Sequence, residues 1–177
     1  MRLFFALKPE PQTCLDIEHW RQRTLPPLNR PVPAGNFHMT LVFLGDVERR
    51  KLDPLLAATE QVSAPAIRLR LDQLGYFPKP QILWIGPGEI PESVTQLVRA
   101  LRRACHESGL AIESRRFIPH ITIARRCHIP PPASAESPAV EIAFDSFCLF
   151  ESIDGRSGVH YQAISEWPLF RDQSGDD

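Results

Sequence analysis

The most restrictive feature of the sequence is an apolar, strand-like phrase that occurs twice, once in each half of the chain. The first copy is NFHMTLVFLG at 36–45, and the second is FIPHITIARR at 117–126. Both contain His-x-Thr followed by an aliphatic residue. Side chains two residues apart in a β-strand point to the same face, so each copy presents an imidazole beside a hydroxyl. The repeat predicts a fold with internal pseudo-symmetry.

The residues that alternate with the His and Thr are predicted to face the other way. In the first copy these are Met39, Leu41 and Phe43, and in the second they are Ile121 and Ile123. All of them are apolar, so regular alternation predicts that they point into a hydrophobic core.

Apolar periodicity predicts further strands and helices around the two phrases. The expected strands cover residues 2–9, 37–44, 66–72, 74–86 as a turn-linked pair, 119–125, 139–151 and 157–166, and the expected helices cover 10–25, 47–62 and 93–107. Strand pairs with helices between them are typical of the α+β class. Residues 1–171 are expected to form one unit of two lobes, and the polar tail 172–177 is expected to be disordered.

Size and composition are those of an ordinary globular protein. The 177 residues are 43% hydrophobic and 23% charged, with a formal net charge of −1. Such a chain does not attract polyanions as a whole, so any contact with nucleic acid must come from a local basic patch. No apolar run approaches the length of a membrane span, and the apolar run at 3–7 is too short for the core of a signal peptide.

The four cysteines are widely separated and form no Cys-x-x-Cys pair: they are Cys14, Cys105, Cys127 and Cys148. This spacing favours buried thiols in a reducing compartment, so a cytoplasmic location is expected. Two of these cysteines directly precede a histidine, which raises the alternative of a zinc site. Adjacent side chains diverge, and zinc ligands are usually about two to five residues apart. No metal or other cofactor is therefore expected.

The imidazole and hydroxyl of each phrase suit the chemistry of a phosphate. A hydroxyl can donate a hydrogen bond to a non-bridging oxygen, and an imidazole can carry a proton near neutral pH. Two such strands facing one another would let one histidine deprotonate water while the other protonates the leaving oxygen opposite. Such a site needs no metal. The alternative is structural, because a single strand histidine is more often a core or surface residue and threonine is a good strand former.

Three segments resemble a known family. RLFFAL at 2–7, HMTLVFLG at 38–45 and PHITIAR at 119–125 are similar to the 2H phosphoesterases, and most of all to the RNA 2′,3′-cyclic phosphodiesterases, also called 2′-5′ RNA ligases. The likeness runs from Arg2 to about Trp167. It implies a two-lobed α+β fold with pseudo-two-fold symmetry, in which antiparallel sheets line a central cleft and helices lie outside.

The resemblance also implies an activity and the residues that perform it. The expected reaction is hydrolysis of a terminal RNA 2′,3′-cyclic phosphate to a 2′-phosphomonoester without a cofactor. Carried over to this chain, His38 is the proton donor and His120 the proton acceptor, while Thr40 and Thr122 hold phosphate oxygens. These roles reverse for ligation.

Three further residues are site candidates with an alternative attached to each. Arg125 lies five positions beyond His120, on the opposite face of a regular strand. A bulge or a strand end would return it to the cleft, where the family pattern has a basic residue; otherwise it is a solvated strand terminus. Phe37 or Tyr76 can stack on the terminal base, as aromatic side chains do in single-stranded RNA recognition, or they are core and rim residues.

Other functions stay open at this point. The same site would serve a small cyclic nucleotide phosphate or the 2′-5′ ligation of tRNA halves. A different class of protein, a non-catalytic module that binds RNA ends, would more readily use arginine or lysine than paired imidazoles. The expected partners are RNA ends bearing a 2′,3′-cyclic phosphate, with tRNA fragments as one option. The expected protein is a monomer without a membrane anchor.

Overall fold

The computed structural model describes residues 1–133, 136–156 and 158–170, so the tail predicted at 172–177 lies outside the described residues. The protein has the α+β fold with antiparallel sheets that its sequence predicts. An eight-stranded sheet has the order β10-β9-β1-β3-β7-β6-β5, with β2 also pairing with β7, and β4 pairs with β8 in a second sheet. The strands are β1 (Arg2–Leu7), β2 (Arg30–Pro31), β3 (Met39–Asp46), β4 (Ile67–Leu71), β5 (Gln73–Phe77), β6 (Ile82–Gly86), β7 (Ile121–Arg125), β8 (Val140–Phe144), β9 (Ser146–Gly155) and β10 (Gly158–Pro168).

Three α-helices, α1 (Pro11–Thr24), α2 (Leu52–Thr59) and α3 (Glu92–Glu107), accompany these strands in the described residues. Helix α2 is shorter than the predicted 47–62, because residues 49–51 form a separate 3-10 turn. Pro54 lacks an amide hydrogen, and proline is tolerated only in the first turn of a helix. The helix accordingly begins at Leu52 and keeps Pro54 within its first turn.

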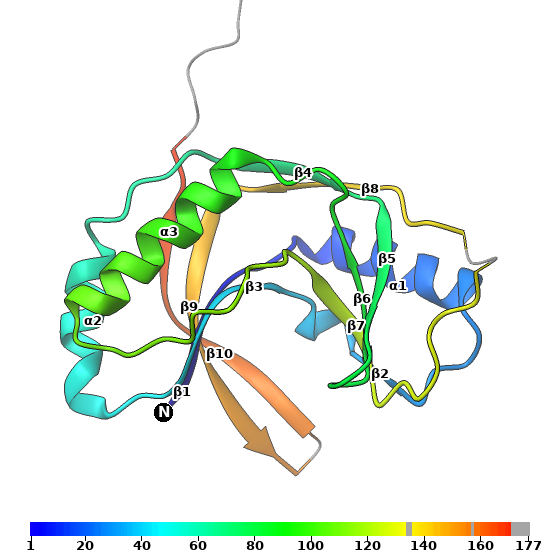
Figure 1. Ribbon diagram of the computed structural model, residues 1–177, viewed down its shortest axis with the longest axis horizontal. Helices are drawn as coiled ribbons and strands as arrows, with labels where there is room; N and C mark the ends of the chain where they lie inside the picture. Colours follow the sequence, from blue (N-terminus) through cyan, green and yellow to red (C-terminus); the bar gives the residue numbers. More distant parts are fainter. Residues whose placement is uncertain (134–135, 157, 171–177) are drawn as a thin grey trace, which may run out of the picture.

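The elements form an arch, with α2 and α3 together at one end of the view and α1 at the other (Figure 1). The β9–β10 hairpin projects beyond the arch (Figure 1). Its register, with Gly155 opposite Gly158, agrees with the predicted turn at 154–158. One hydrophobic cluster contains residues of both halves, from Leu3 to Leu169.

The two halves of the sheet meet where β3 pairs with β7. In this antiparallel pair Met39 lies opposite Ile121, and both side chains have 0% exposure. These are the residues between His and Thr in the two phrases. A pseudo-two-fold axis therefore passes between the repeated phrases.

A bulge in β3 overturns one prediction about its packing. Ala6 lies opposite Thr40 and Phe5 opposite Val42, so β3 has one residue more than β1 at this point. The extra residue breaks the alternation of side chains. Leu41 and Val42 are both buried, and the next side chain, Phe43, is 48% exposed instead of lying in the core.

Strand β7 carries a matching bulge three residues after its histidine. Ala124 lies opposite Leu83 and Thr122 opposite Trp84, so Ile123 is the additional residue. Ile123 and Ala124 are both buried, and the alternation again shifts by one position. The bulge returns Arg125 to the face of the strand that carries Thr122. Of the two placements expected from the sequence, Arg125 therefore has the one on the cleft side.

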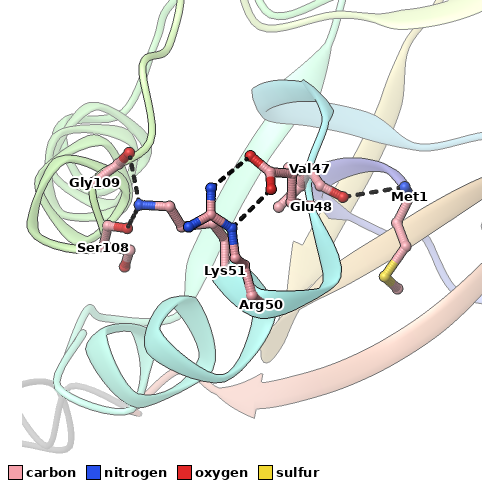
Figure 2. A network of polar contacts seen from close by, with 7 residues as sticks. All are labelled: Met1, Val47, Glu48, Arg50, Lys51, Ser108 and Gly109. Atoms are coloured by element: carbon pink, nitrogen blue, oxygen red, sulfur yellow. Dashed lines mark hydrogen bonds and ion pairs between the residues drawn. The ribbon is translucent and has the colours of Figure 1, made fainter.

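Polar contacts connect the segment after β3 with the N-terminal residue and with the end of α3 (Figure 2). The Met1 ammonium donates to the Val47 carbonyl at 3.1 Å. Lys51 Nζ donates to the carbonyls of Ser108 at 3.5 Å and Gly109 at 3.4 Å. A cation at the carbonyl end of a helix is favourable, so Lys51 stabilises the end of α3.

We expect Gly75→Ala to destabilise the protein. A Cβ at Gly75 would lie 2.0 Å from Trp84 Cζ2, whereas a Cβ at Gly35 would have nothing within 4 Å. Overpacking of this kind typically costs about 1–3 kcal/mol. Urea unfolding followed by circular dichroism should show that loss for Gly75→Ala and a change within about 0.5 kcal/mol for Gly35→Ala. Equal stability of the two variants would contradict the packing described.

Candidate active site

The two motif histidines have the same local geometry. His38 Nδ1 lies 2.7 Å from the carbonyl oxygen of Asn36, and His120 Nδ1 lies 2.7 Å from that of Ile118. A carbonyl oxygen only accepts hydrogen bonds, so Nδ1 carries the hydrogen in both rings. Nε2 is then the nitrogen that can accept or give a proton in each imidazole.

Aromatic side chains flank each imidazole. The His38 ring lies 5.0 Å from the Phe4 ring and 4.8 Å from the Tyr161 ring. The corresponding neighbours of His120 are Phe77 at 5.1 Å and Trp84 at 5.9 Å. These aromatic residues come from β1, β10, β5 and β6. Each half of the sheet therefore supplies two aromatic walls that restrict the orientation of its own histidine.

The strand register places the four motif side chains together. Met39 pairs with Ile121 in antiparallel orientation. When this register is continued by one residue in each direction, His38 lies opposite Thr122 and Thr40 lies opposite His120. These residues lie on the face opposite to the buried pair, because side chains alternate along a strand. Each imidazole consequently has the hydroxyl of the other phrase across from it.

The surroundings favour neutral imidazoles. Burial lowers the pKa of His38 to about 4; the Asn36 carbonyl opposes this, and the positive charges of Arg125, His120 and Lys8 add to it. Burial also lowers the pKa of His120, against the effect of the Ile118 carbonyl and together with the charge of Arg125. Both histidines are thus neutral at pH 7 in the ligand-free protein.

An open cleft of about 1110 Å³ lies over β1 and β3 and has His38, Thr40 and Arg125 among its lining residues. His120 and Thr122 are not lining residues and lie beside the cleft, across the β3–β7 pair. Within the described residues, no three His, Cys, Asp or Glu side chains gather as metal ligands would. The four cysteines are all buried and free.

The two predicted stacking residues do not face the cleft. Phe37 has 0% exposure, and the Arg21 guanidinium lies 5.4 Å from its ring centroid. Tyr76 lies opposite Leu83 on the core side of β5, and its hydroxyl donates to the Cys127 carbonyl at 2.6 Å. Full burial contradicts the stacking role predicted for Phe37. Tyr76 is half-buried, and its side chain lies on the face of β5 opposite to that of Phe77.

Other aromatic residues lie near the motif histidines instead. Phe77 is the neighbour of Tyr76 and contacts His120, so a correct assignment of strand face would have found it. Phe43 presents an exposed ring to the cleft that contains His38 and Thr40. The bulge in β3 turns Phe43 toward the cleft, and the residue pattern does not predict that bulge.

A buried arginine supports both phrases from behind. Arg21 of α1 is 6% exposed, and its Nη1 donates to the carbonyls of Val32 at 2.6 Å and Ile123 at 2.7 Å. Val32 precedes the first phrase, and Ile123 is the bulge residue of the second. A buried charge is costly unless it is hydrogen-bonded, so these two bonds hold the segments in one arrangement.

Comparison with known proteins identifies the family. The profile described as the 2′-5′ RNA ligase superfamily matches residues 9–156, and the chain belongs to that family. The RNA 2′,3′-cyclic phosphodiesterase of Escherichia coli (strain K12) is 35% identical over 173 residues, which are 95% of this chain and 96% of the relative. The enzyme of that name from Thermus thermophilus is 31% identical over 185 aligned residues, with 96% and 90% coverage.

Solved structures give the same fold. E. coli LigT in apo form has a TM-score of 0.87 at 32% identity, covering 96% of this chain and 98% of that one. E. coli LigT complexed with 3′-AMP has a TM-score of 0.82 at 33% identity, with the same coverage. The two-lobed, pseudo-two-fold 2H phosphoesterase fold is therefore the fold of this protein. None of the helices in the described part of the chain is long and apolar enough to span a membrane.

We expect kcat/KM for a phosphodiester substrate to be highest on the acid side of neutrality. Catalysis by an acid and a base requires one proton on the histidine pair, and both pKa values lie below the ordinary 6.5. Above both values, the singly protonated form declines about tenfold per pH unit. The kcat profile should extend to higher pH, because a bound phosphate anion raises the pKa of an adjacent histidine. A kcat/KM that rises between pH 6.5 and 8 would contradict these environments.

Replacement of Arg125 should raise the pKa of both histidines. Its charge lowers the pKa of His38 and of His120, so Arg125→Gln removes a positive charge that opposes their protonation. Histidine ring resonances followed by NMR over an acid-to-neutral pH series should show both midpoints moving upward. Arg126→Gln is the matched control, because Arg126 is not a cause of either shift. Unchanged midpoints in Arg125→Gln would mean that Arg125 does not face the pair.

Proposed function

We propose that this protein hydrolyses the terminal 2′,3′-cyclic phosphate of RNA to a 2′-phosphomonoester, with His38 as general acid and His120 as general base. The observation that carries the proposal is the pair of imidazoles related by the β3–β7 pairing, each with Nε2 as its exchangeable nitrogen. The names of the similar enzymes support the substrate and the reaction.

The proposed reaction is an in-line displacement at phosphorus. His120 Nε2 takes a proton from water as the water oxygen forms a bond to phosphorus. The bond from phosphorus to the 3′ oxygen breaks on the opposite side, and His38 gives its Nε2 proton to that oxygen. Proton exchange with solvent then restores a protonated His38 and a neutral His120. Ligation would use the 5′-hydroxyl of a second RNA in place of water: that oxygen would bond to phosphorus and lose its proton to the base, while the same bond to the 3′ oxygen breaks.

Three further residues bind the phosphate in this proposal. Thr40 and Thr122 donate hydroxyl hydrogen bonds to the non-bridging oxygens from either side of the pair. Arg125 supplies a guanidinium, which pairs well with phosphate oxygens. The anionic phosphate in turn offsets the charges of Arg125 and Lys8, which lower the pKa of His38. Substrate binding thereby favours the protonated form of His38 that the reaction requires.

We further propose a natural substrate, an oligomeric state and a cellular location. RNA fragments, including tRNA fragments, are suitable substrates because their ends carry the cyclic phosphate. A monomer suffices, since one chain supplies both motifs. A cytoplasmic location is consistent with four free, buried cysteines, and burial raises the pKa of Cys105 to about 12 and of Cys148 to about 11, which keeps them unreactive thiols.

The test uses a short RNA ending in a 2′,3′-cyclic phosphate, incubated with the protein in excess EDTA. The wild-type protein should release a 2′-phosphomonoester, and both His38→Ala and His120→Ala should reduce kcat by about 10²–10⁴-fold. His160→Ala is the control, because this exposed histidine has no role in the proposed site. The product is identified by chromatography against 2′- and 3′-phosphate standards.

The possible results separate the alternatives. A 3′-phosphate product, or activity only after divalent metal is restored, would contradict the proposed chemistry. Binding of the RNA with no turnover would favour the end-binding module. Hydrolysis that persists in both motif variants would show that the wrong histidines have been assigned.

A further inference from the structure

The cleft beside His38 holds more positive charge than one phosphate requires. Four arginines are among its lining residues, namely Arg2, Arg30, Arg125 and Arg156, and no carboxylate is. The chain as a whole has a net charge of −1, so this charge is a local concentration. A cleft lined by one sign of charge focuses the field and attracts ligands of the opposite sign.

None of these four arginines is neutralised by a carboxylate in the described part of the chain. Elsewhere on the surface arginines do pair with acids, as Arg50 does with Glu48 at 2.8 Å. Arg2 lies over the Phe43 ring at 5.5 Å, a cation–π contact that leaves its charge in place. The four arginines of the cleft therefore form no ion pair with a carboxylate within the described residues.

Two of these cations face one another directly. Arg30 of β2 lies opposite Arg125 of β7 in the antiparallel register. Like charges directly opposite on neighbouring strands are destabilising. An anion between them would remove this repulsion, so the pair indicates that a second negative group binds near the one held by Arg125.

Arg30 and Arg156 lie on different sides of the cleft floor. The strand order sets β9 and β10 on one side of β1 and β3, and β7 on the other. Arg156 is in the turn between β9 and β10, and Arg30 is in β2, which pairs with β7. The two guanidinium groups thus flank the floor that His38 and Thr40 line.

The size of the cleft also exceeds the needs of one nucleotide. Its volume is about 1110 Å³, whereas pockets for single small ligands usually have about 300–1,000 Å³. Aromatic and basic side chains share its lining, with Phe43 exposed, and proteins that bind single-stranded nucleic acid combine these two features along the strand.

We propose that Arg30 and Arg156 bind the internal phosphates of an RNA strand whose cyclic-phosphate end lies at His38 and His120. The enzyme accordingly prefers oligoribonucleotide ends to cyclic mononucleotides. This inference rests on the proposed function for the reaction at the end, but the binding of internal phosphates can be measured without turnover.

The experiment compares a trinucleotide ending in a 2′,3′-cyclic phosphate with 2′,3′-cyclic AMP. The wild-type protein should favour the trinucleotide by about tenfold or more in kcat/KM, the effect of a charge-assisted contact or two. In the double variant Arg30→Ala/Arg156→Ala this ratio should fall close to one. A general loss of activity cancels in the ratio. The salt dependence of the trinucleotide reaction should also weaken, by about 0.7 in log–log slope for each phosphate that is no longer bound.

The matched control is Arg68→Ala/Arg99→Ala, which removes the same charge from exposed positions on β4 and α3. It should keep the wild-type ratio. A second measurement, fluorescence anisotropy with a labelled trinucleotide ending in a 2′-phosphate, gives the affinity without turnover. The Arg30→Ala/Arg156→Ala variant should bind this RNA about tenfold more weakly than the control variant does.

Each result bears on one of the two proposals. Equal wild-type rates on both substrates, or an equal loss of ratio in the control variant, would overturn the inference while leaving the hydrolytic function intact. Hydrolysis of neither substrate, together with RNA binding that depends on Arg30 and Arg156, would overturn the hydrolytic function and support the inference. RNA binding that is the same in both double variants would overturn the inference whatever the rates.

Discussion

The antiparallel pairing of Met39 with Ile121 is the contact on which the site depends. It joins β3 to β7 and so connects the halves of the eight-stranded sheet. Both side chains are removed from water, which makes a slip of one residue unfavourable because it would expose them and bury polar neighbours. The same alternation that buries this pair places an imidazole and a hydroxyl from each phrase on the opposite face. Arg21 reinforces the junction from behind through the carbonyls of Val32 and Ile123.

The electrostatics of the site follow from how its histidines are enclosed. Aromatic walls remove water from the imidazoles, and desolvation disfavours their charged form. The positive charge of Arg125 in the adjoining cleft also lowers the pKa of both histidines. The ligand-free site thus combines neutral histidines with an excess of positive charge. A phosphate anion is the group that satisfies both conditions, because it neutralises the arginines and stabilises a protonated imidazole. The proposed function therefore couples phosphate binding to proton uptake in one small region.

The sequence predicted much of this arrangement correctly. Strand periodicity around the two phrases indicated which faces carry His38 and Thr40, and the pattern of strand pairs and helices indicated the α+β class. Prediction from the sequence was less successful where the alternation of side chains along a strand is interrupted. Phe43 was predicted to lie in the core, and the face of Arg125 was left between two options. The cause in each strand is a bulge, in which one extra residue interrupts the alternation of side chains. The extra residues, Leu41 in β3 and Ile123 in β7, are as apolar as the residues around them, so the sequence pattern does not reveal either bulge.

The aromatic residues also show what local sequence periodicity cannot predict. Phe37 and Tyr76 were reasonable stacking candidates by type and position, but one fills the core and the other anchors its hydroxyl on the Cys127 carbonyl. The walls of the histidine pockets come instead from strands distant in sequence, such as Phe4 of β1 and Tyr161 of β10. Contacts of this kind depend on strand order, which local periodicity does not encode.

By itself, the sequence determined which side chains could do the chemistry and that each phrase would present them on one face of a strand, because a two-residue repeat is a local property of the backbone. Only the tertiary structure decided that the two phrases lie side by side, that the bulges turn Phe43 and Arg125 toward the cleft, and that Arg30 stands opposite Arg125. Those outcomes depend on the register between strands, which is set by packing across the whole sheet and not by neighbours along the chain.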